Sequence, residues 1–575
     1  MKLFCIVCIC TLASGAWALE REAFTVTKYD LAITLDQQQQ RLGARGKITL
    51  RNDSAQPQKI AALQISSSLD WRSIRVEGKP VQYVSQPFTS DIDHTGALSE
   101  AIVTLPGEIK PQDSVEIEIG YEGVIPLDTT RLTRVGVPEA IARHSSWDRI
   151  GPSFTAVRGA GYVAWYPITT ESADFSEGNS LFEVVDRWKA REAQSGMEVH
   201  LCAEAAGPAS PRIAMNQALR KSANSGADDN RICGEYRFEP LGTVTPVFAA
   251  ADYVLNAKVP VSVLSLPGHE AGALTYFNSL EPAMKFVTDW FGAPTSEVTI
   301  ADFPDPNSAA FESGTLLMAS MAAEDSKLAG TNVVHELTHS ALPSYRPWVY
   351  EGLAHFAEAV YRQQQGGREA ALDFLALHSA AFLDAEKEIS AGPQNVAEKS
   401  EAARSAGQPL VSTFDEAYYR SKAAYVWWML RDMVGDEALK QAIAKYRAAD
   451  DKDPKYVERL VEAAAKRDLG WFFDDWVYHD RGLPDLRVQS AHPWKTEKDV
   501  QFITVTMENL GNAGAEVPFT VRSEGGEVTK RIEVRAKSTA TTRIELPGAP
   551  SEIVVNDGSV PGSDSSNNVF EISER

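Results

Sequence analysis

The period of the hydrophobic pattern changes twice along this chain of 575 residues. In the first part apolar residues alternate with polar ones, as at Leu31, Ile33 and Leu35, and a period of two is typical of a strand with one buried face. From about residue 256 to 485 the apolar residues recur at helical spacing, and after Pro484 the alternation returns. Because a chain of this length exceeds a single core, the sequence predicts an α+β multidomain protein.

The predicted domains follow these changes of period. We expect a β-sheet domain over residues 19–255, a mainly α domain over residues 256–485, and a β-sandwich over residues 486–575. The polar segment from Gly558 to Asn568 is predicted to be a poorly ordered tail. Helices of the middle domain are expected at 271–291, at 331–342 with Asn332 as N-cap, at 348–365 ending at Gly366-Gly367, at 369–388 and at 419–434.

The first residues are typical of an export signal. Lys2 supplies a positive start, an apolar run extends from Leu3 to Leu12, and Ala16 and Ala18 are the small residues that a signal peptidase prefers. We therefore expect cleavage after Ala18 and a mature protein in the periplasm or outside the cell. The alternatives are an uncleaved anchor or a buried strand. No later segment is apolar enough for a membrane span, so stable insertion after cleavage is not expected.

Two cysteines remain after the predicted signal, Cys202 and Cys233. In an exported protein they are expected to form one disulfide that stabilises the fold by roughly 3 kcal/mol. The alternative is a pair of unrelated free thiols.

The formal net charge is −22. Nucleic acids and anionic membrane surfaces bind clustered Lys and Arg residues, so this balance argues against both as partners.

The segment His335-Glu-Leu-Thr-His339 fits the HExxH pattern of zinc sites. Positions four apart share a helix face, so both imidazoles can bind one ion. Glu336 lies about 100° around the helix from His335, where it can accept a proton from water at that ion. The alternative is an amphipathic helix with two histidines satisfied by other partners.

A catalytic zinc site needs a third protein ligand and an open position. Trp348-Val-Tyr-Glu351-Gly-Leu-Ala follows after a short turn, and Glu351 falls near the start of the next helix, where a helical hairpin would return it to the ion. Glu351, His355 and Glu358 share one face of that helix. Only one of them is expected to be a ligand, and another can hold a ligand imidazole in place.

These motifs resemble the aminopeptidase N-like gluzincins, the zinc peptidase family that also contains leukotriene hydrolase. In that family the Glu of Trp-x-x-Glu-Gly-x-Ala is the third zinc ligand, which implies Glu351 here. Eleven residues separate His339 from Glu351, as a short-loop bacterial relative would have, whereas the usual family spacing of eighteen leads to Glu358. Glu358 therefore remains the alternative. The resemblance implies one Zn²⁺ per chain, a saddle-like β domain, a thermolysin-like catalytic domain and a C-terminal β-sandwich.

Two further segments carry the resemblance. Ala309-Ala-Phe-Glu312-Ser resembles the family's edge strand, which implies that Glu312 grips the free α-amine of a peptide substrate. Tyr418-Tyr419-Arg-Ser-Lys422 resembles the family's Tyr-Glu-Lys-Gly helix with one residue more before the Lys. The family's Tyr stabilises the oxyanion, which implies Tyr419, with Tyr418 as the alternative. No counterpart of the family's second amine-binding residue is found.

The sequence thus predicts a zinc-dependent aminopeptidase that releases N-terminal residues from peptides. A zinc endopeptidase on the same scaffold and a catalytically silent exported binding protein are the alternatives. The presence of Glu336 argues against the silent protein, because a scaffold without catalysis needs no general base.

Overall fold

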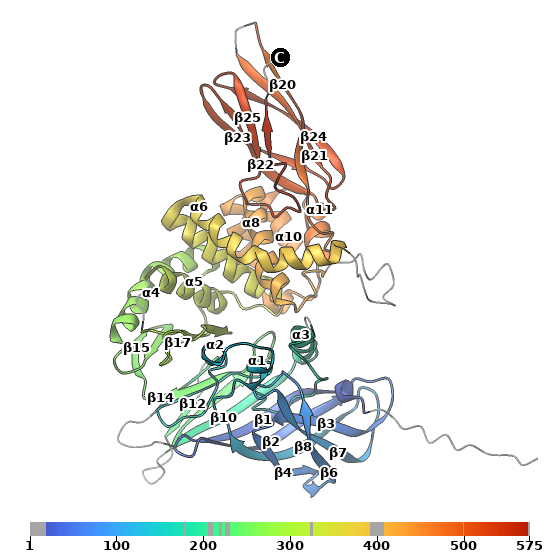
Figure 1. Ribbon diagram of the computed structural model, residues 1–575, viewed down its shortest axis with the longest axis vertical. Helices are drawn as coiled ribbons and strands as arrows, with labels where there is room; N and C mark the ends of the chain where they lie inside the picture. The colour runs from blue at the N-terminus through green and yellow to red at the C-terminus, as the bar shows by residue number, and fades with distance from the viewer. Residues whose placement is uncertain are drawn as a thin grey trace, which may run out of the picture.

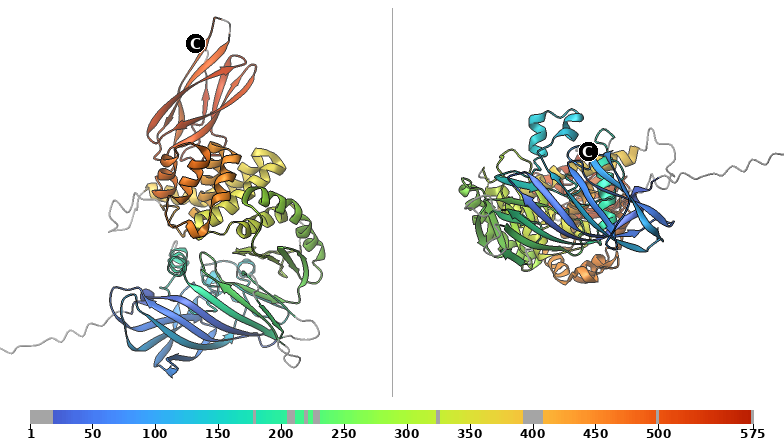
Figure 2. Two further views of the ribbon diagram at one scale, coloured as in Figure 1. Left: turned by 180° about the vertical axis from the view of Figure 1, so that it is seen from behind. Right: turned by 90° about the horizontal axis from the view of Figure 1, so that it is seen from below.

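The structure is a computed structural model that describes residues 19–177, 180–204, 211–217, 221–224, 231–322, 326–391, 408–497 and 500–572. The predicted export signal, residues 1–18, lies outside them. Strands from the first part of the chain lie at one end of the molecule, helices lie in the middle, and strands from the last part lie at the other end (Figures 1 and 2). The prediction of a mixed α/β protein with several sheets is confirmed. The exact domain boundaries stay a prediction.

A large mixed sheet forms the base of the N-terminal body. In sheet order its strands are β12 (Lys221–Asn224), β13 (Arg231–Phe238), β10 (Gly196–Glu204), β1 (Phe24–Asp36), β2 (Arg41–Asn52), β8 (Ser114–Val124), β4 (Leu69–Val76) and β5 (Lys79–Pro80). Leu31, Ile33 and Leu35 of β1 are buried, as their alternation predicted. Cys202 on β10 and Cys233 on β13 lie opposite each other and form the predicted disulfide.

Smaller sheets and helices complete this body. The strands are β3 (Gln58–Ser66), β7 (Ala97–Ile109) and β6 (Tyr83–Thr89) in one sheet, and β11 (Arg212–Met215), β14 (Phe248–Ala251) and β9 (Phe154–Val157) in another. The helices are α1 (Thr130–Arg134), α2 (Glu139–Ser145) and α3 (Ser180–Glu192). All three helices lie on the side of the body that faces the central helices (Figure 1).

The central part begins with a small sheet and a long helix. In sheet order the strands are β15 (Val254–Lys258), β16 (Val261–Ser265), β17 (Val298–Ala301), β19 (Leu316–Met318) and β18 (Phe311–Ser313), and the helix is α4 (Glu270–Phe291). Among the described strands β18 is at the edge, paired antiparallel to β19. A buried apolar cluster joins β9 and β14 to β19, so the N-terminal body fixes the position of this edge.

The remaining central elements are helical. They are α5 (Ser326–Ala341), α6 (Pro347–Ala391), the π-helical turn η2 (Ala417–Lys422), α8 (Ala423–Val434), α9 (Asp436–Lys445), α10 (Tyr456–Ala465), α11 (Gly470–Phe473) and η4 (Asp474–Tyr478). Helix α5 starts six residues before Asn332, so the prediction of Asn332 as N-cap is wrong. Gly367 has φ 83° and interrupts α6, where the sequence predicted a helix end. None of the described helices has the length and apolarity that a membrane crossing requires.

Two small sheets form the C-terminal body. Their strands, in sheet order, are β20 (Leu486–Lys495), β21 (Gln501–Asn509) and β24 (Ser538–Leu546), and β23 (Gly526–Val534), β22 (Ala515–Ser523), β25 (Pro550–Val555) and β26 (Val569–Glu571). Their buried residues continue the apolar core of the central helices. The segment predicted to be a loose tail packs on the body instead: Val560 is buried, and the backbone N–H of Ser563 donates to the carbonyl of Pro484.

Candidate metal centre

Two buried imidazole rings face each other on α5. Because helix positions four apart share a face, His335 and His339 stand one turn apart on the same side. Their Nε2 atoms are 3.0 Å apart. The neighbouring Val333, Val334 and Leu337 are buried in the apolar core and hold the helix in place. When the rings are protonated at Nδ1, both Nε2 atoms present lone pairs that can bind a metal ion.

Glu351, in the first turns of α6, completes a group of three residues that could hold a metal ion. Its carboxylate oxygens lie 3.8 Å from Nε2 of His335 and 3.8 Å from Nε2 of His339. The three residues are buried and their ligand atoms lie within 4.8 Å of one another. A tetrahedral zinc ion with bonds of about 2.0–2.1 Å separates its ligand atoms by about 3.3 Å, so small side-chain shifts suffice. Oε2 of Glu351 is buried with no hydrogen-bond partner among the described residues, which leaves this oxygen able to bind a metal ion. The residues therefore fit a zinc ion.

Glu358 lies on the other side of the His335 ring. Its Oε2 atom is 3.3 Å from Nδ1 of His335 and 2.7 Å from Nδ1 of His355. An acceptor at Nδ1 favours the tautomer that leaves Nε2 of His335 free for a metal ion. The sequence left open whether Glu351 or Glu358 is the third ligand, and the structure places the two residues differently. Glu351 faces the Nε2 atoms of His335 and His339, whereas Glu358 faces Nδ1 of His335.

Glu336 is fully buried beside His335. Both of its carboxylate oxygens lack a hydrogen-bond partner. Burial raises the pKa of the Glu336 carboxyl well above its ordinary value, and the positive charge on His335 opposes this shift. A buried carboxyl with unused oxygens and a raised pKa has the properties of a general base that takes up and returns a proton.

Glu312 reaches the centre from the edge strand β18. Its Oε2 atom lies 3.3 Å from Nε2 of His335, and its Oε1 atom lies 3.0 Å from Nη1 of Arg420. Arg420 also places its Nε atom 3.5 Å from Oε2 of Glu351. The sequence analysis assigned no role to Arg420, although it follows Tyr419 directly. The Arg420 guanidinium therefore lies within ion-pair distance of the carboxylates of both Glu312 and Glu351.

Tyr419 and Arg420 belong to the π-helical turn η2. A π-turn holds one residue more than an α-turn and is frequent at functional sites. It therefore accommodates the extra residue that the sequence showed before Lys422. The Tyr419 hydroxyl donates to Oε1 of Glu416 at 3.2 Å. Tyr419 lines the cavity described below, whereas the Tyr418 ring lies 5.3 Å from Nζ of Lys422 and is absent from the cavity lining.

Two buried contacts fix η2 against its neighbours. A Cβ atom at Gly352 would lie 2.6 Å from Cβ of Ala423, so only glycine lets α6 approach the start of α8 this closely. At the other end of η2, the Lys422 ammonium is buried between the carboxylates of Glu386, at 2.5 Å, and Asp480. Gly352, which directly follows Glu351, thus helps to place the turn that carries Tyr419.

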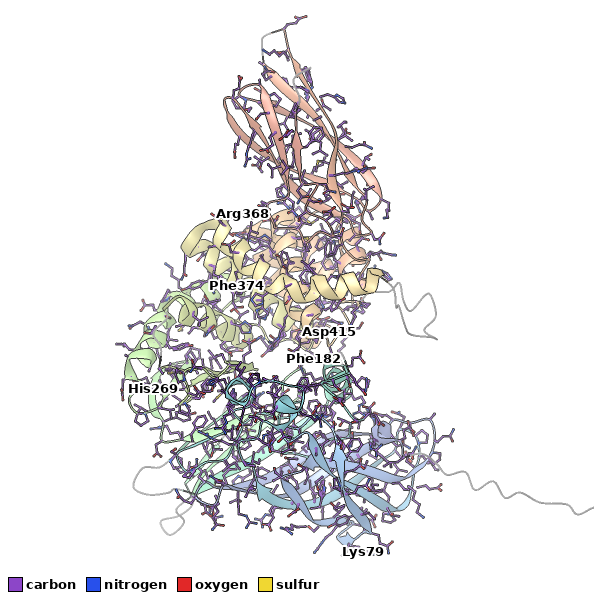
Figure 3. All side chains as sticks on the ribbon, viewed as in Figure 1. Lys79, Phe182, His269, Arg368, Phe374 and Asp415 are labelled. Atoms are coloured by element: carbon purple, nitrogen blue, oxygen red, sulfur yellow. A yellow bond between two sulfur atoms is a disulfide. The ribbon has the colours of Figure 1, made fainter. Side chains whose placement is uncertain are left out.

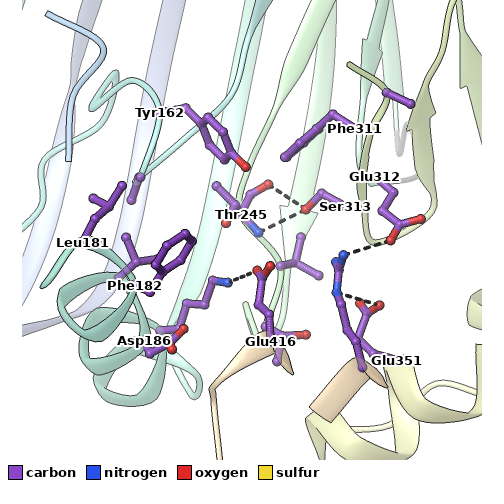
Figure 4. Close-up of a pocket in the computed structure, with 18 of the residues that line it drawn as sticks. Tyr162, Leu181, Phe182, Asp186, Thr245, Phe311, Glu312, Ser313, Glu351 and Glu416 are labelled. Carbon is purple, nitrogen blue, oxygen red and sulfur yellow. Dashed lines mark hydrogen bonds and ion pairs between the residues drawn. The ribbon is translucent and has the colours of Figure 1, made fainter. Parts of the chain in front are cut away.

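A cavity of 510 Å³ opens at this centre between the N-terminal body and the central helices. Its central wall includes Glu312, Glu351, Tyr419 and Arg420, and its N-terminal wall includes residues of α1 and α3 and of the segments at 145–146, 160–162 and 243–245. Figure 4 shows Glu351, Glu416 and Glu312 facing Phe182, Thr245 and Tyr162 across it. Of the three candidate ligands, Glu351 lines this cavity.

Helix α3 contributes charge and apolar surface to this cavity. Phe182 on α3 and Asp415, two residues before η2, lie on opposite sides of the boundary between the bodies (Figure 3). Lys189 crosses the boundary, with Nζ 3.0 Å from Oε1 of Glu416. Burial raises the pKa of Asp186 to about 7; Lys189 opposes the shift, and the nearby carboxylate of Asp415 adds to it. The sequence analysis did not connect α3 with the site.

No protein-family model matches this sequence, and no curated protein matches it. The chain is similar to the crystal structure of an M1 zinc metallopeptidase from Deinococcus radiodurans, with a TM-score of 0.46 and 16% identity over 80% of this chain and 96% of that chain. It is also similar to a two-domain M1 zinc metallopeptidase variant bound to L-arginine, with a TM-score of 0.46 and 16% identity over 80% of this chain and 94% of that chain.

Proposed function

We propose that this protein is a zinc-dependent peptidase, and that it acts as an aminopeptidase. One observation carries the proposal: the Nε2 atoms of His335 and His339, 3.0 Å apart, and the carboxylate of Glu351 converge beside a cavity large enough for a peptide. One zinc ion per chain, held by these three residues, would polarise a peptide carbonyl and acidify water.

The chain's own residues would handle protons and charge. Glu336 would accept the proton of the attacking water and return it to the leaving amine. The Tyr419 hydroxyl would turn from Glu416 to the substrate carbonyl and donate a hydrogen bond to its oxygen as negative charge develops there. Glu358 would keep His335 in the tautomer that binds the ion.

Aminopeptidase specificity would come from the edge strand β18. A substrate can add to such an edge through backbone hydrogen bonds. Glu312 on this strand would bind the α-ammonium group of the first residue through a charge-assisted hydrogen bond. The carboxylate is 25% exposed and lines the cavity, so an incoming amine can reach it.

The ion pair between Glu312 and Arg420 favours a second candidate, an endopeptidase. With Nη1 of Arg420 at 3.0 Å, Oε1 of Glu312 already has a cationic partner. If this pair persists when substrate binds, the α-ammonium group has no free carboxylate, and peptides without a free N-terminus fit equally well. The two candidates share the zinc site and differ only in this contact.

The experiment combines metal analysis with cleavage of matched peptides. The purified protein is assayed for zinc and tested on peptides with a free or an acetylated N-terminus, beside Glu336→Ala and Glu312→Ala. We expect about one zinc per chain, a loss of at least about 100-fold in Glu336→Ala, and a selective loss on free N-termini in Glu312→Ala. Equal loss on free and acetylated peptides in Glu312→Ala would establish the endopeptidase. A protein without zinc would overturn both candidates.

We also propose that the protein works in the periplasm or outside the cell, since residues 1–18 have the composition of an export signal and Cys202 and Cys233 form a disulfide. Determining the N-terminus of the secreted protein tests this. A mature chain beginning at Leu19 is expected, and an intact Met1 in the cytoplasm would contradict it.

A further inference from the structure

Arg131 on α1 is a buried arginine without a carboxylate partner among the described residues. Its exposed fraction is 3%. Its Nη1 atom donates to the backbone carbonyls of Asp91, at 2.8 Å, and Gly161, at 2.7 Å. Its Nε atom is buried with no hydrogen-bond partner. A buried charge is costly unless it is paired, so an arginine in this state needs an explanation.

The acidic residues nearby are already used by other groups. Asp91 accepts two hydrogen bonds from Arg134, each 2.7 Å long. Asp148 is bound by the Arg158 guanidinium at 2.6 Å. Asp93 accepts from the hydroxyls of Ser66 and Thr95 and from the backbone N–H of Ala164. Asp93 and Asp148 contribute favourable long-range charge, but neither lies within ion-pair distance of Arg131.

Arg131 lines the same cavity as Glu351, one of the three proposed zinc ligands. Ser146, on the same wall, is fully buried, and its hydroxyl has no hydrogen-bond partner. The Tyr162 hydroxyl points into the cavity (Figure 4). The Tyr162 ring packs edge-on against Phe311 at 5.4 Å, which brings this wall next to Glu312 on β18. A guanidinium and two hydroxyls therefore converge on the cavity from the N-terminal body.

Two acidic residues of the opposite wall have cations of their own. Glu416 is paired with Lys189 and Glu312 with Arg420. Neither is therefore free to neutralise Arg131 across the cavity.

We propose that Arg131, with Ser146 and Tyr162, forms a subsite that binds a carboxylate of the peptide substrate. A carboxylate would accept charge-assisted hydrogen bonds from the guanidinium and neutralise it. The group is either an Asp or Glu side chain or the C-terminal carboxylate of a short peptide. This inference rests on the proposed peptidase function and adds a preference for acidic substrates.

The test measures binding separately from cleavage. Zinc-loaded Glu336→Gln protein is titrated with alanine tetrapeptide amides that carry Glu or Gln at each position in turn, and with tetra-alanine as free acid and as amide. We expect one carboxylate-bearing peptide to bind about tenfold or more tightly than its neutral match. A Glu peptide identifies a side chain as the source, and the free acid identifies the C-terminus. Equal affinities within every pair would overturn the subsite.

Matched variants locate the preference. The variants are made in the Glu336→Gln protein, and for each the affinity for the carboxylate-bearing peptide is divided by the affinity for its neutral match. Arg131→Gln is expected to bring this ratio to about one, and Ser146→Ala is expected to reduce it. Arg134→Gln, the same change three residues later on α1 outside the cavity lining, should keep it. If Arg131→Gln does not fold, the Ser146→Ala ratio decides. A folded Arg131→Gln protein with an unchanged ratio would show that Arg131 is structural only.

Cleavage by the otherwise unmodified protein separates this inference from the proposed function. If neutral peptides are cleaved but carboxylate-bearing peptides bind no better, the subsite fails and the peptidase stands. If carboxylate-bearing peptides bind selectively but no peptide is cleaved, the peptidase fails and the binding site stands.

Discussion

Oε2 of Glu358 lies 3.3 Å from Nδ1 of His335, on the side of the ring away from the proposed metal position. Replacing Glu358 by Gln should therefore lower zinc affinity by about 10–100-fold, the usual effect of losing a group that orients a ligand. Glu351→Gln removes a ligand and should lower affinity further. Competition with a chelator measures both variants. A larger loss in Glu358→Gln would make Glu358 the third ligand.

Tyr419→Phe should lower kcat by about 100–1,000-fold with little change in zinc content, because one donor to the developing oxyanion is lost. Tyr418→Phe provides the matched control, since Tyr418 lies against Lys422 and is absent from the cavity lining. Steady-state kinetics on one peptide compares the two variants. A large loss in Tyr418→Phe and none in Tyr419→Phe would reverse the assignment.

Asp186→Asn should stabilise the fold in alkaline solution. The pKa of Asp186 is about 7 in the folded protein and 3.8 in the unfolded chain, so between these values the folded state holds the extra proton. The free energy of unfolding therefore falls as pH rises from about 4 to 7, because the folded state has to give up this proton. Above about pH 7 Asp186 is ionised in both states and its destabilising effect is at its full size. Allowing for partial exposure, the variant should gain on the order of 2 kcal/mol at pH about 8 and nothing near pH 4.

Urea unfolding of wild type and Asp186→Asn at both pH values measures this effect. Glu183→Gln, on the exposed face of the same helix, is the comparison and should show a much smaller pH-dependent gain, because its charge adds only weakly to the pKa shift of Asp186. A gain of equal size at both pH values would mean that the effect does not come from the ionisation of Asp186.

Gly352→Ala should destabilise the protein by about 1–3 kcal/mol and lower kcat, because the added methyl group forces α6 away from Ala423 and moves η2. Gly330→Ala on α5 is the control, since its Cβ would meet Tyr361 at 3.4 Å, an ordinary contact. Thermal unfolding and kinetics measure both. An active, fully stable Gly352→Ala protein would show that this close approach does not position η2.

Local patterns predicted the elements that carry the centre. The i and i+4 spacing of His335 and His339 predicted one shared helix face, and the structure places their Nε2 atoms 3.0 Å apart. The pair Gly366-Gly367 marked the point at which Gly367 interrupts α6. The start of α5 was missed because Gly330-Thr331-Asn332 has the composition of a helix start, whereas in the structure these residues continue a helix that begins at Ser326.

The cavity wall could not be read from local patterns. Lys189 and Glu416 are 227 residues apart, and their contact depends on how the N-terminal body docks against η2. Hydrophobic periodicity predicts which face of a helix or strand is buried, but it does not predict which other element packs against that face. Arg420 was missed for a related reason: its direction depends on the π-turn, which an α-helical reading of 419–434 does not contain.

The buried contact of Lys422 with Glu386 and Asp480 sets an order of events during synthesis. The ribosome delivers Glu386 first and Asp480 last, and Trp476, whose ring lies 5.7 Å from Nζ of Lys422, arrives just before Asp480. Until that stretch has emerged, the Lys422 ammonium lacks its second carboxylate and its cover, and η2 is open to water from behind. A chain cut before residue 474 would therefore lack the Asp480 carboxylate and the Trp476 ring that cover the Lys422 ammonium at the end of η2.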